Sequence, residues 1–198
     1  MKNALKAVLN GLGALLALPF VVWARIGLSL FGSERPYSAS AQALALVPGA
    51  PGRFMRRGFY CLVLARCSWD VDIHFGSIVT HPTTRLGRRA WIGLYSLIGT
   101  CTIGDDVIIG SRVSILSGRR PHRFDDAERK VADQPGEYRE LTIGADSWFG
   151  EGCVVMADVG ARCVVGAGAV VVKPLAERTV AAGNPAREIN RRGDGGGG

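Results

Sequence analysis

Residues 86–116 decide the fold, and they read LGRRAWIGLYSLIGTCTIGDDVIIGSRVSIL. A bulky apolar residue recurs about every six positions and is most often followed by glycine. The series resumes after a gap, and its members are Leu86, Ile92, Ile98, Ile103, Ile109, Ile115, Ile143, Phe149, Val155, Val165 and Val171. Neither the 3.6-residue period of a helix nor the two-residue alternation of a strand produces this spacing. Three such hexads per turn predict short parallel strands, stacked as triangular coils about 4.8 Å apart.

A second series of small or β-branched residues stands two positions before the first. Its members are Ala90, Ser96, Cys101, Val107, Val113, Ser147, Cys153, Cys163 and Ala169. Both series are expected to point into the triangular prism, so Cys101, Cys153 and Cys163 are core residues rather than nucleophiles. The five cysteines form no CxxC motif and no histidine-paired metal spacing, which favours reduced thiols in a cytoplasmic protein.

Composition limits the class of protein. The 198 residues include 47% hydrophobic residues, which excludes a disordered chain, and 27 glycines without the every-third-residue register of collagen. The net charge is +7, and residues 1–60 contribute +6 of it. The charged residues of that segment are Lys2, Lys6, Arg25, Arg35, Arg53, Arg56 and Arg57 against Glu34. A basic excess on an apolar N-terminus favours an anionic membrane surface over nucleic acid, and no nucleic-acid-binding motif follows.

The N-terminal segment has an uncharged run from Ala7 to Ala24. A membrane-spanning helix is one interpretation, although the run is short and contains Asn10 and Pro19. A cleaved signal peptide is a second, although no small-x-small site follows Trp23. A third, which we favour, is a kinked helix that continues to about residue 31 and lies on a membrane or a partner. An ordinary buried helix remains the alternative.

These patterns divide the chain into three parts. Residues 1–60 form a hydrophobic, basic segment, and a turn or linker is expected at 48–52, where the sequence is PGAPG. Residues 61–190 form the β-helix domain with a polar loop at 117–141, and residues 191–198 form a disordered tail. The expected fold class is therefore all-β, a parallel β-helix preceded by an α-helical hydrophobic N-terminal segment.

The hexads occur together with Trp148-Phe149-Gly150, the sequence VGAGA at 165–169 and the sequence AGNPAR at 182–187. In this combination the chain resembles the left-handed β-helix, hexapeptide-repeat acyltransferases, such as the galactoside, maltose and xenobiotic O-acetyltransferases, over about residues 70–190. The resemblance implies a left-handed helix, a homotrimer and acetyl-CoA lying along the coils between neighbouring subunits. It also implies a catalytic histidine on a loop that interrupts the coils.

His122 is the histidine of loop 117–141. Acyl transfer to an alcohol needs a base for the hydroxyl proton, and imidazole titrates in the right range. In the related enzymes the histidine follows a Ser/Thr-Gly pair by one or two residues, whereas Gly118 and His122 are four apart. Asp125, Asp126 and Glu128 are alternatives for orienting the ring.

Residue-by-residue matching to the family's motifs implies that Ala167, Val172, Lys173 and Arg187 bind acetyl-CoA, with the two cations at its phosphates. A solvated surface arginine is the alternative for Arg187. The chain departs from the family where Glu151 replaces a small polar residue and Asn190 replaces an arginine, for which Arg191 or Arg192 can substitute. Trp148 occupies a position that is commonly aromatic, for packing or ligand contact.

The predicted function is an acetyl-CoA-dependent O-acetyltransferase that acts on a hydroxyl of a sugar, a glycan or a lipid-linked precursor, in the cytoplasm or at the inner face of the cell membrane. A serine or amino-sugar acetyltransferase and a non-catalytic scaffold are the alternatives. His74 and His81 do not match the pattern of the zinc hydratases that share this fold, because the pair of histidines five apart that those relatives carry is missing, so no metal is expected. The sequence leaves open the acceptor, the acyl chain length and the membrane topology.

Overall fold

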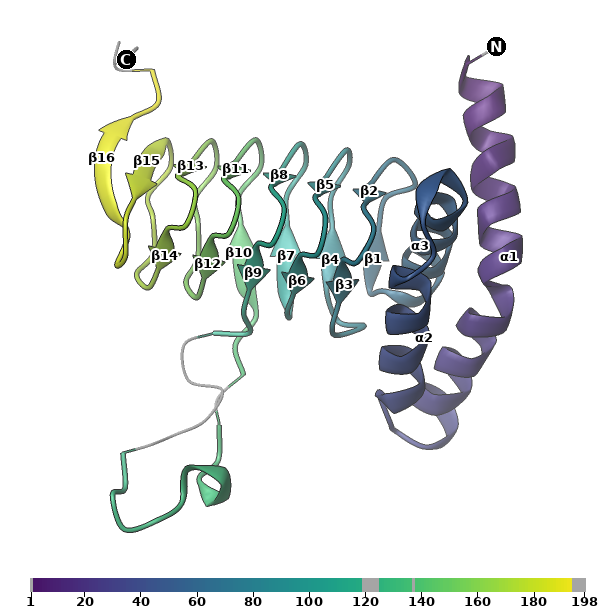
Figure 1. Ribbon diagram of the computed structural model, residues 1–198, viewed down its shortest axis with the longest axis horizontal. Coiled ribbons are helices and arrows are strands. Elements are labelled where there is room, and N and C mark those ends of the chain that lie inside the picture. The colour runs from purple at the N-terminus through teal and green to yellow at the C-terminus, as the bar shows by residue number, and fades with distance from the viewer. Residues whose placement is uncertain (1, 119–124, 137, 194–198) are drawn as a thin grey trace.

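The computed structural model describes residues 2–118, 125–136 and 138–193, and for residues 2 and 3 it describes the backbone only. Three helices precede a parallel β-helix, and a loop leaves the β-helix midway as an arm (Figure 1). The helices are α1 (Lys2–Leu30), α2 (Arg35–Ala45) and α3 (Gly49–Val63). The expected fold class is confirmed.

Three sheets form the sides of the prism, and all their pairings are parallel except the last one of sheet B. Sheet A contains β1 (Arg66–Cys67), β4 (Arg85–Leu86), β7 (Cys101–Ile103) and β10 (Leu141–Ile143). Sheet B contains β2 (Asp72–Ile73), β5 (Trp91–Ile92), β8 (Ile108–Ile109), β11 (Trp148–Phe149), β13 (Val164–Val165), β15 (Thr179–Ala182) and β16 (Arg187–Arg191). Sheet C contains β3 (Ile78–Val79), β6 (Leu97–Ile98), β9 (Ser114–Ile115), β12 (Val154–Val155) and β14 (Val170–Val171). Single bridges through Val159 and Leu175 continue sheet A.

The core of the β-helix consists of the two predicted series. Every member of both series is at most 2% exposed, so their inward orientation is confirmed, including that of the three core cysteines. The repeat starts one coil earlier than expected, because Ile73 and Val79 are also fully buried. Each coil places its bulky residue directly on that of the next coil, as when Phe149 pairs in register with Ile109 and Val165.

Hydroxyl groups inside the prism find backbone partners. Ser96 Oγ donates to the Gly110 carbonyl at 2.9 Å, Ser147 Oγ to the Gly160 carbonyl at 3.0 Å, and Thr84 Oγ1 to the Gly99 carbonyl at 3.0 Å. Each bond reaches from one coil to a carbonyl of the next. A buried polar group that is hydrogen-bonded costs little, which explains why serine and threonine are tolerated inside the prism beside alanine, valine and cysteine.

Glycine is required where successive coils meet at a corner. A Cβ atom on Gly150 would lie 2.5 Å from the backbone nitrogen of Ala167 in the next coil. Two residues on, Gly152 has a φ of +72°, and a methyl group added there would have no atom within 4 Å. Close coil stacking therefore demands glycine at the first position, and the left-handed backbone favours it at the second.

The helices cover the open edge of the first coil. Tyr37 donates its hydroxyl hydrogen to the Val79 carbonyl at 2.8 Å, and the Val79 amide donates to the Tyr60 hydroxyl at 3.1 Å. The Gly76 amide donates to the Ala45 carbonyl at 2.9 Å. An uncovered sheet edge would be free to pair with another chain, so α2 and α3 act as a cap on this end of the β-helix.

Two arginines of the basic segment are buried in this cap. Arg56 is fully buried and donates to the carbonyls of Leu44, Val47 and Ile73, while Arg57 donates to the Val71 carbonyl at 2.6 Å. The expectation that the N-terminal basic excess faces a membrane is therefore wrong for these two side chains. Backbone carbonyls at the ends of α2 and of β2 need donors, and the guanidinium groups supply them.

The turn expected at 48–52 is instead the start of α3. Pro48 is the N-cap and the helix begins at Gly49, so Pro51 lies within the first turn. Amide groups in the first turn of a helix have no partner inside the helix, so a proline there removes no hydrogen bond. The proline and glycine content gave the correct position of a boundary but the wrong local structure.

The helix α1 continues through Pro19 to Leu30. Its part from Ala4 to Leu30 is long and apolar enough to cross a membrane. Core helices of soluble proteins and signal sequences meet the same criterion of length and composition. At the opposite end, β16 pairs antiparallel with β15 and covers the final coil. Because β16 extends through Arg191, ordered structure reaches into the segment that was expected to be a tail.

Candidate functional site

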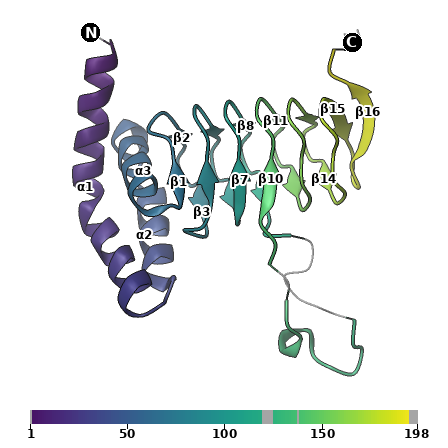
Figure 2. The same ribbon diagram turned by 180° about the vertical axis from the view of Figure 1, so that it is seen from behind.

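The arm (residues 117–140) leaves the β-helix after sheet C and returns to sheet A, so it replaces the tight corner between these sheets in the third coil (Figures 1 and 2). At its base the Arg139 amide donates to the Ser117 carbonyl at 3.0 Å, and Ser117 Oγ accepts from the Thr100 amide at 2.9 Å. Asp158 pairs with Arg139 and accepts from the Thr142 amide at 2.9 Å. The outgoing and returning segments of the arm are thus hydrogen-bonded to each other and to the neighbouring coils.

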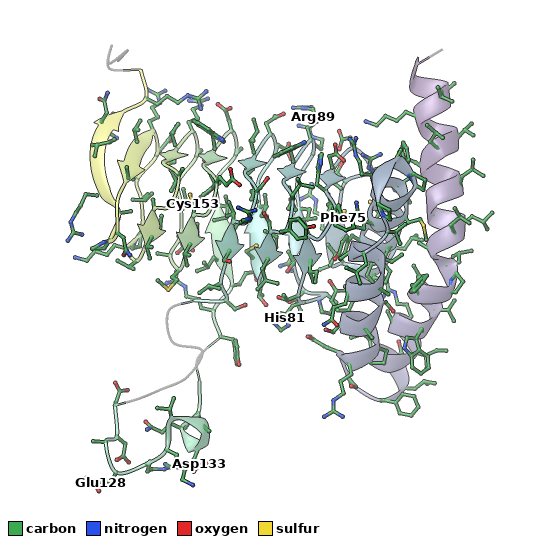
Figure 3. The ribbon with its side chains drawn as sticks, in the orientation of Figure 1. Phe75, His81, Arg89, Glu128, Asp133 and Cys153 are labelled. Atoms are coloured by element: carbon green, nitrogen blue, oxygen red, sulfur yellow. The ribbon has the colours of Figure 1, made fainter. Side chains whose placement is uncertain are left out.

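The described distal part of the arm is organised around Gln134. This side chain is buried, and its Nε2 atom donates to the carbonyls of Asp126 at 2.8 Å and Arg129 at 3.0 Å. A short 3₁₀ turn at Val131–Asp133 precedes it. Figure 3 shows Glu128 and Asp133 in this part, well away from the β-helix that contains Cys153.

His122 lies outside the described residues, so its role as a base stays a prediction. Of the three acidic alternatives for orienting it, Asp126 accepts a hydrogen bond from the Glu128 amide at 3.0 Å, and all three residues are exposed.

The four predicted cofactor residues flank β14. Ala167 lies on the corner that leads into this strand, and Val172 and Lys173 follow it directly. The turn before Arg187 is bound to the same strand, because the Val170 amide donates to the Gly183 carbonyl at 3.0 Å and the Ala186 amide donates to the Val170 carbonyl at 2.8 Å. Ala167, Lys173 and Arg187 are exposed and Val172 is half-buried.

The base of the arm and Val172 lie on the same corner of the prism. The Leu116 amide donates to the Val155 carbonyl at 2.9 Å, and the Met156 amide donates to the Val171 carbonyl at 2.9 Å. Leu116, Met156 and Val172 therefore follow one another in consecutive coils. The arm emerges two coils from Val172 and Lys173, along one edge of sheet C.

The other edge of sheet C contains Ala167 and Glu151. The Gly168 amide donates to the Glu151 carbonyl at 2.8 Å, and Arg112 of the preceding coil lies 3.8 Å from the Glu151 carboxylate. The departure from the family at position 151 thus places an exposed acid, faced by an exposed arginine, next to Ala167. Between the two edges, sheet C presents a mainly apolar outer row: Ile78, Leu97, Ser114, Val154 and Val170.

The cations around β14 differ in their partners. Arg192 lies 3.0 Å from Asp146, and Arg191 lies 4.0 Å from Glu188. Within the described part of the chain, Lys173 and Arg187 make neither a hydrogen bond nor an ion pair through their side chains. The two predicted phosphate-binding residues therefore have no acidic partner among the described residues, whereas the two substitutes have acidic neighbours.

The other two histidines, His74 and His81, lie near the cap end of the β-helix. His74 lies 4.7 Å from Trp91 between ring centroids and 3.4 Å from Asp72, and burial lowers its pKa. His81 Nδ1 lies 2.7 Å from Glu34 Oε2. The described residues contain no group of three His, Cys, Asp or Glu side chains that could hold a metal ion.

Two features of the surface escaped the sequence analysis. A groove of about 320 Å³ lies over sheet B and is lined by Asp106, Ile108, Asp146, Ser147, Trp148, Val164 and Arg192. Trp148 is 52% exposed, so packing inside this chain does not account for it. The only sign of this groove in the sequence is that two large apolar residues, Ile108 and Trp148, occupy paired outward positions of β8 and β11.

In the cap, the thiols of Cys61 and Cys67 lie 3.3 Å apart as free cysteines.

No family model matches the sequence. Among curated proteins, the chain is 34% identical over 98 residues to the galactoside O-acetyltransferase of Escherichia coli K12, covering 48% of this chain and 44% of that protein. It is 31% identical over 145 residues to the serine acetyltransferase of Bacillus pumilus, covering 71% of this chain and 59% of that protein. The chain thus spans about half the length of the curated relatives it matches.

Two solved structures are similar over most of the chain. A maltose O-acetyltransferase from Clostridium difficile has a TM-score of 0.70 at 21% identity, covering 84% of this chain and 90% of that one. A hexapeptide-repeat acetyltransferase from Vibrio cholerae, complexed with acetyl coenzyme A, has a TM-score of 0.68 at 22% identity, covering 85% and 92%. The chain resembles the hexapeptide-repeat acetyltransferases in sequence and in fold. At these identities the structural similarity establishes the hexapeptide-repeat β-helix, and the sequence similarity connects it to acetyltransferases.

Proposed function

We propose that this protein is an acetyl-CoA-dependent O-acetyltransferase that modifies a hydroxyl group of a sugar or glycan precursor. The observation that supports this most directly is the cluster around β14, where Lys173 and Arg187 present positive charges that no described residue pairs, beside Ala167 and Val172. The relatives that the sequence matches include acetyltransferases for sugar and serine acceptors. The similar structure from Vibrio cholerae is itself a complex with acetyl coenzyme A.

The residues present fit acetyl-CoA as a substrate. Its phosphates need cations that no carboxylate already neutralises, and Lys173 and Arg187 satisfy this condition within the described ranges of the chain. Its pantetheine arm is extended and largely uncharged, which suits the apolar outer row of sheet C between the two edges. The thioester would then point along sheet C toward the base of the arm.

The arm supplies the acid–base group in this proposal. His122 accepts the proton of the acceptor hydroxyl as its oxygen bonds to the thioester carbon. The tetrahedral oxyanion collapses, the carbon–sulfur bond breaks, and the proton passes to the departing thiolate of CoA. No covalent acyl-enzyme is needed. The location of the arm, on the same corner as Val172, supports this assignment because it keeps the base near the proposed end of the pantetheine.

A homotrimer at the inner face of the cell membrane completes the proposal. The exposed Trp148 and Ile108 on sheet B offer apolar surface to a neighbouring subunit or to a ligand held between subunits. The apolar N-terminal helix supports a location at a membrane and hence a lipid-linked sugar as acceptor.

A serine or amino-sugar acetyltransferase is the second candidate. The similarity to the Bacillus pumilus serine acetyltransferase, which covers more of this chain than that to the galactoside enzyme, favours it. This candidate keeps the CoA site and changes only the acceptor. A non-catalytic scaffold, by contrast, would bind no CoA.

Binding of CoA, measured by calorimetry, tests the site. We expect Lys173→Ala and Arg187→Ala each to weaken binding about 10- to 100-fold, since a hydrogen bond to a charged group contributes roughly 1.5–3 kcal/mol. Arg162→Ala is the matched control, because Arg162 is an exposed arginine that lies 3.5 Å from Glu177 on a different corner. Undetectable binding by the unaltered chain would rule out the proposal.

Acetyl transfer to a panel of sugars, amino sugars and serine, with the unaltered chain and with His122→Ala, tests the chemistry. We expect transfer to a sugar hydroxyl and its loss in the variant with CoA binding intact. Equal turnover by both proteins would remove His122 from the mechanism. Preference for an amine or for serine would select the second candidate.

A further inference from the structure

The helix α1 has an inner face of small residues that packs closely on the cap. A Cβ atom on Gly13 would lie 2.5 Å from the carbonyl carbon of Phe54, and one on Gly58 would lie 2.5 Å from Ala14 Cα. Ala17 and Ala24 on the same face are fully buried. The helices are in van der Waals contact along their backbones, so α1 is an integral part of the cap.

Polar groups fix α1 on this face. Asn10 Nδ2 donates to the Trp69 carbonyl at 3.2 Å, and Asn10 Oδ1 accepts from Arg57 at 2.7 Å. Arg57 in turn lies 3.7 Å from Asp72 in the first coil. Near the other end of the helix, Arg25 donates to the Leu62 carbonyl. These bonds join α1 to α3 and to the β-helix.

The outer face of α1 is apolar and uncovered. Large side chains on it are between 37% and 73% exposed, and they are Leu5, Val8, Leu12, Leu15, Leu16, Leu18, Val22, Trp23, Ile26 and Leu30. An apolar groove of about 280 Å³ continues this face between α1 and α3, lined by Leu9, Leu12, Gly13, Leu16, Ala50, Pro51 and Phe54. An apolar surface of this extent on a soluble protein marks an interaction site.

The charges beside this face are positive. Lys6 and Arg25 are exposed on α1, and Arg35 is exposed at the start of α2. The one acidic residue of the segment, Glu34, lies against His81. An apolar stripe edged by cations matches the surface of an anionic bilayer, where each lysine or arginine adds about 1 kcal/mol of attraction.

We propose that α1 lies in the plane of an anionic membrane, with its outer face in the interfacial region of one leaflet and its inner face on the cap, and that it does not span the bilayer. This inference rests on the membrane location given under Proposed function and is independent of the acyl-transfer chemistry. A spanning α1 would take α3 into the hydrocarbon or separate from it. The first alternative would carry Arg53, Arg56 and Arg57 into lipid, at roughly 2.5–3.5 kcal/mol each, and the second would break the partly buried Asn10–Arg57 hydrogen bond.

This attachment orients the rest of the molecule. The helix α1 runs across the end of the β-helix, so the coils stack away from its inner face (Figures 1 and 2). With its outer face on lipid, the helical cap lies between the leaflet and the β-helix, and the first coil is the coil nearest the membrane. The strand β14 belongs to the fifth coil and therefore lies about 19 Å farther from the membrane than the first coil, at about 4.8 Å per coil.

Flotation of the purified full chain with vesicles of phosphatidylcholine alone, or with phosphatidylglycerol added, tests the surface. We expect binding to the anionic vesicles and at least a tenfold loss in Val8→Gln/Leu15→Gln/Val22→Gln, which alters one line of the outer face. Leu94→Gln/Val131→Gln/Ile189→Gln is the matched control, because it changes three exposed apolar residues outside the cap and outside the proposed subunit and acetyl-CoA surfaces. Equal binding by both triple variants, or none by the unaltered chain, would overturn the proposal. A concentration-dependent dimer that the first triple variant abolishes, without vesicle binding, would assign the face to a second copy instead.

Protease access distinguishes the two topologies. Membrane vesicles with the cytoplasmic face outward are prepared from cells expressing the chain with an N-terminal epitope tag. We expect added protease to remove the tag without detergent, because both ends of an in-plane helix lie on the same side as the β-helix. A tag protected until detergent is added would show that α1 spans. Neither assay depends on acetyl transfer, so loss of membrane binding and loss of the proposed activity are separable results.

Discussion

Replacing Arg56 by methionine should release the helical cap from the β-helix. Arg56 donates to the Val47 carbonyl at 2.8 Å, the Leu44 carbonyl at 2.9 Å and the Ile73 carbonyl at 3.0 Å. It thereby connects the end of α2 with β2 across the body of α3. Methionine replaces the aliphatic stem of the arginine, but it donates no hydrogen bond.

The expected cost follows from two opposing effects. Removing the cation leaves two buried carbonyls and one partly buried carbonyl without this donor, at roughly 1–3 kcal/mol each. It also relieves the desolvation of the guanidinium, which is several kcal/mol for a buried ion and which lowers the pKa of Arg56. We expect a net loss of about 3 kcal/mol in the free energy of unfolding.

Urea unfolding, followed by circular dichroism, measures this loss. For a slope of about 2 kcal/mol per molar urea, the midpoint should fall by about 1.5 M. Amide hydrogen exchange at Gly76, which is bonded to the Ala45 carbonyl at the end of α2, should accelerate in the variant. Exchange in the fourth and fifth coils should change less, because the cap does not contact them.

Arg53→Met is the control for this prediction. Arg53 pairs with Asp72 through both its Nε and a terminal nitrogen, yet its side chain is 44% exposed, so the pair contributes at most about 1 kcal/mol. If the two variants lowered the midpoint equally, the loss would reflect charge alone. An unchanged midpoint in Arg56→Met would refute the assignment of this residue as the link between cap and coils.

Three further predictions concern single groups. Gly150→Ala should prevent correct stacking of the coils and lower the melting temperature far more than Gly152→Ala, because the first methyl group meets the Ala167 backbone at 2.5 Å and the second has no neighbour within 4 Å; equal losses would contradict the stacking geometry. Burial raises the pKa of Cys101 from its ordinary value of 9.0 to about 12, so between these pH values the thiol ionises in the unfolded state and not in the folded state. The free energy of unfolding should therefore decline over this range, and unfolding scans of Cys101→Ala should show a smaller decline. Burial lowers the pKa of His74 below its ordinary 6.5, so the unfolded state takes up the proton first as the pH falls. The free energy of unfolding should therefore be lower at pH 5 than at pH 7.5, and His74→Gln should reduce this difference. An equal difference in that variant would show that other groups cause it.

The sequence alone determined the β-helix and its contents. The six-residue spacing fixed which side chains point inward, and every predicted member of both series is buried. This succeeded because each coil repeats the environment of the previous one, so a local period specifies the core without any knowledge of distant contacts. The same period identified Cys101, Cys153 and Cys163 as core residues.

The ends of the β-helix and the surfaces around it were decided only by the tertiary structure. Arg56 and Arg57 belong to a basic cluster that sequence reasoning assigns to a surface, and they are buried because carbonyls at the ends of α2 and in the first coil need donors. The two faces of α1 likewise depend on its contacts with α3.

The candidate site combines both kinds of information. Family motifs selected Ala167, Val172, Lys173 and Arg187, but their convergence on β14 depends on the turn at 183–186, which returns the chain to Val170. The pairing of Arg192 with the distant Asp146 also requires that the chain fold back after this turn. A repeat specifies its own interior, whereas the charge partners of a surface residue depend on which distant segment folds back beside it.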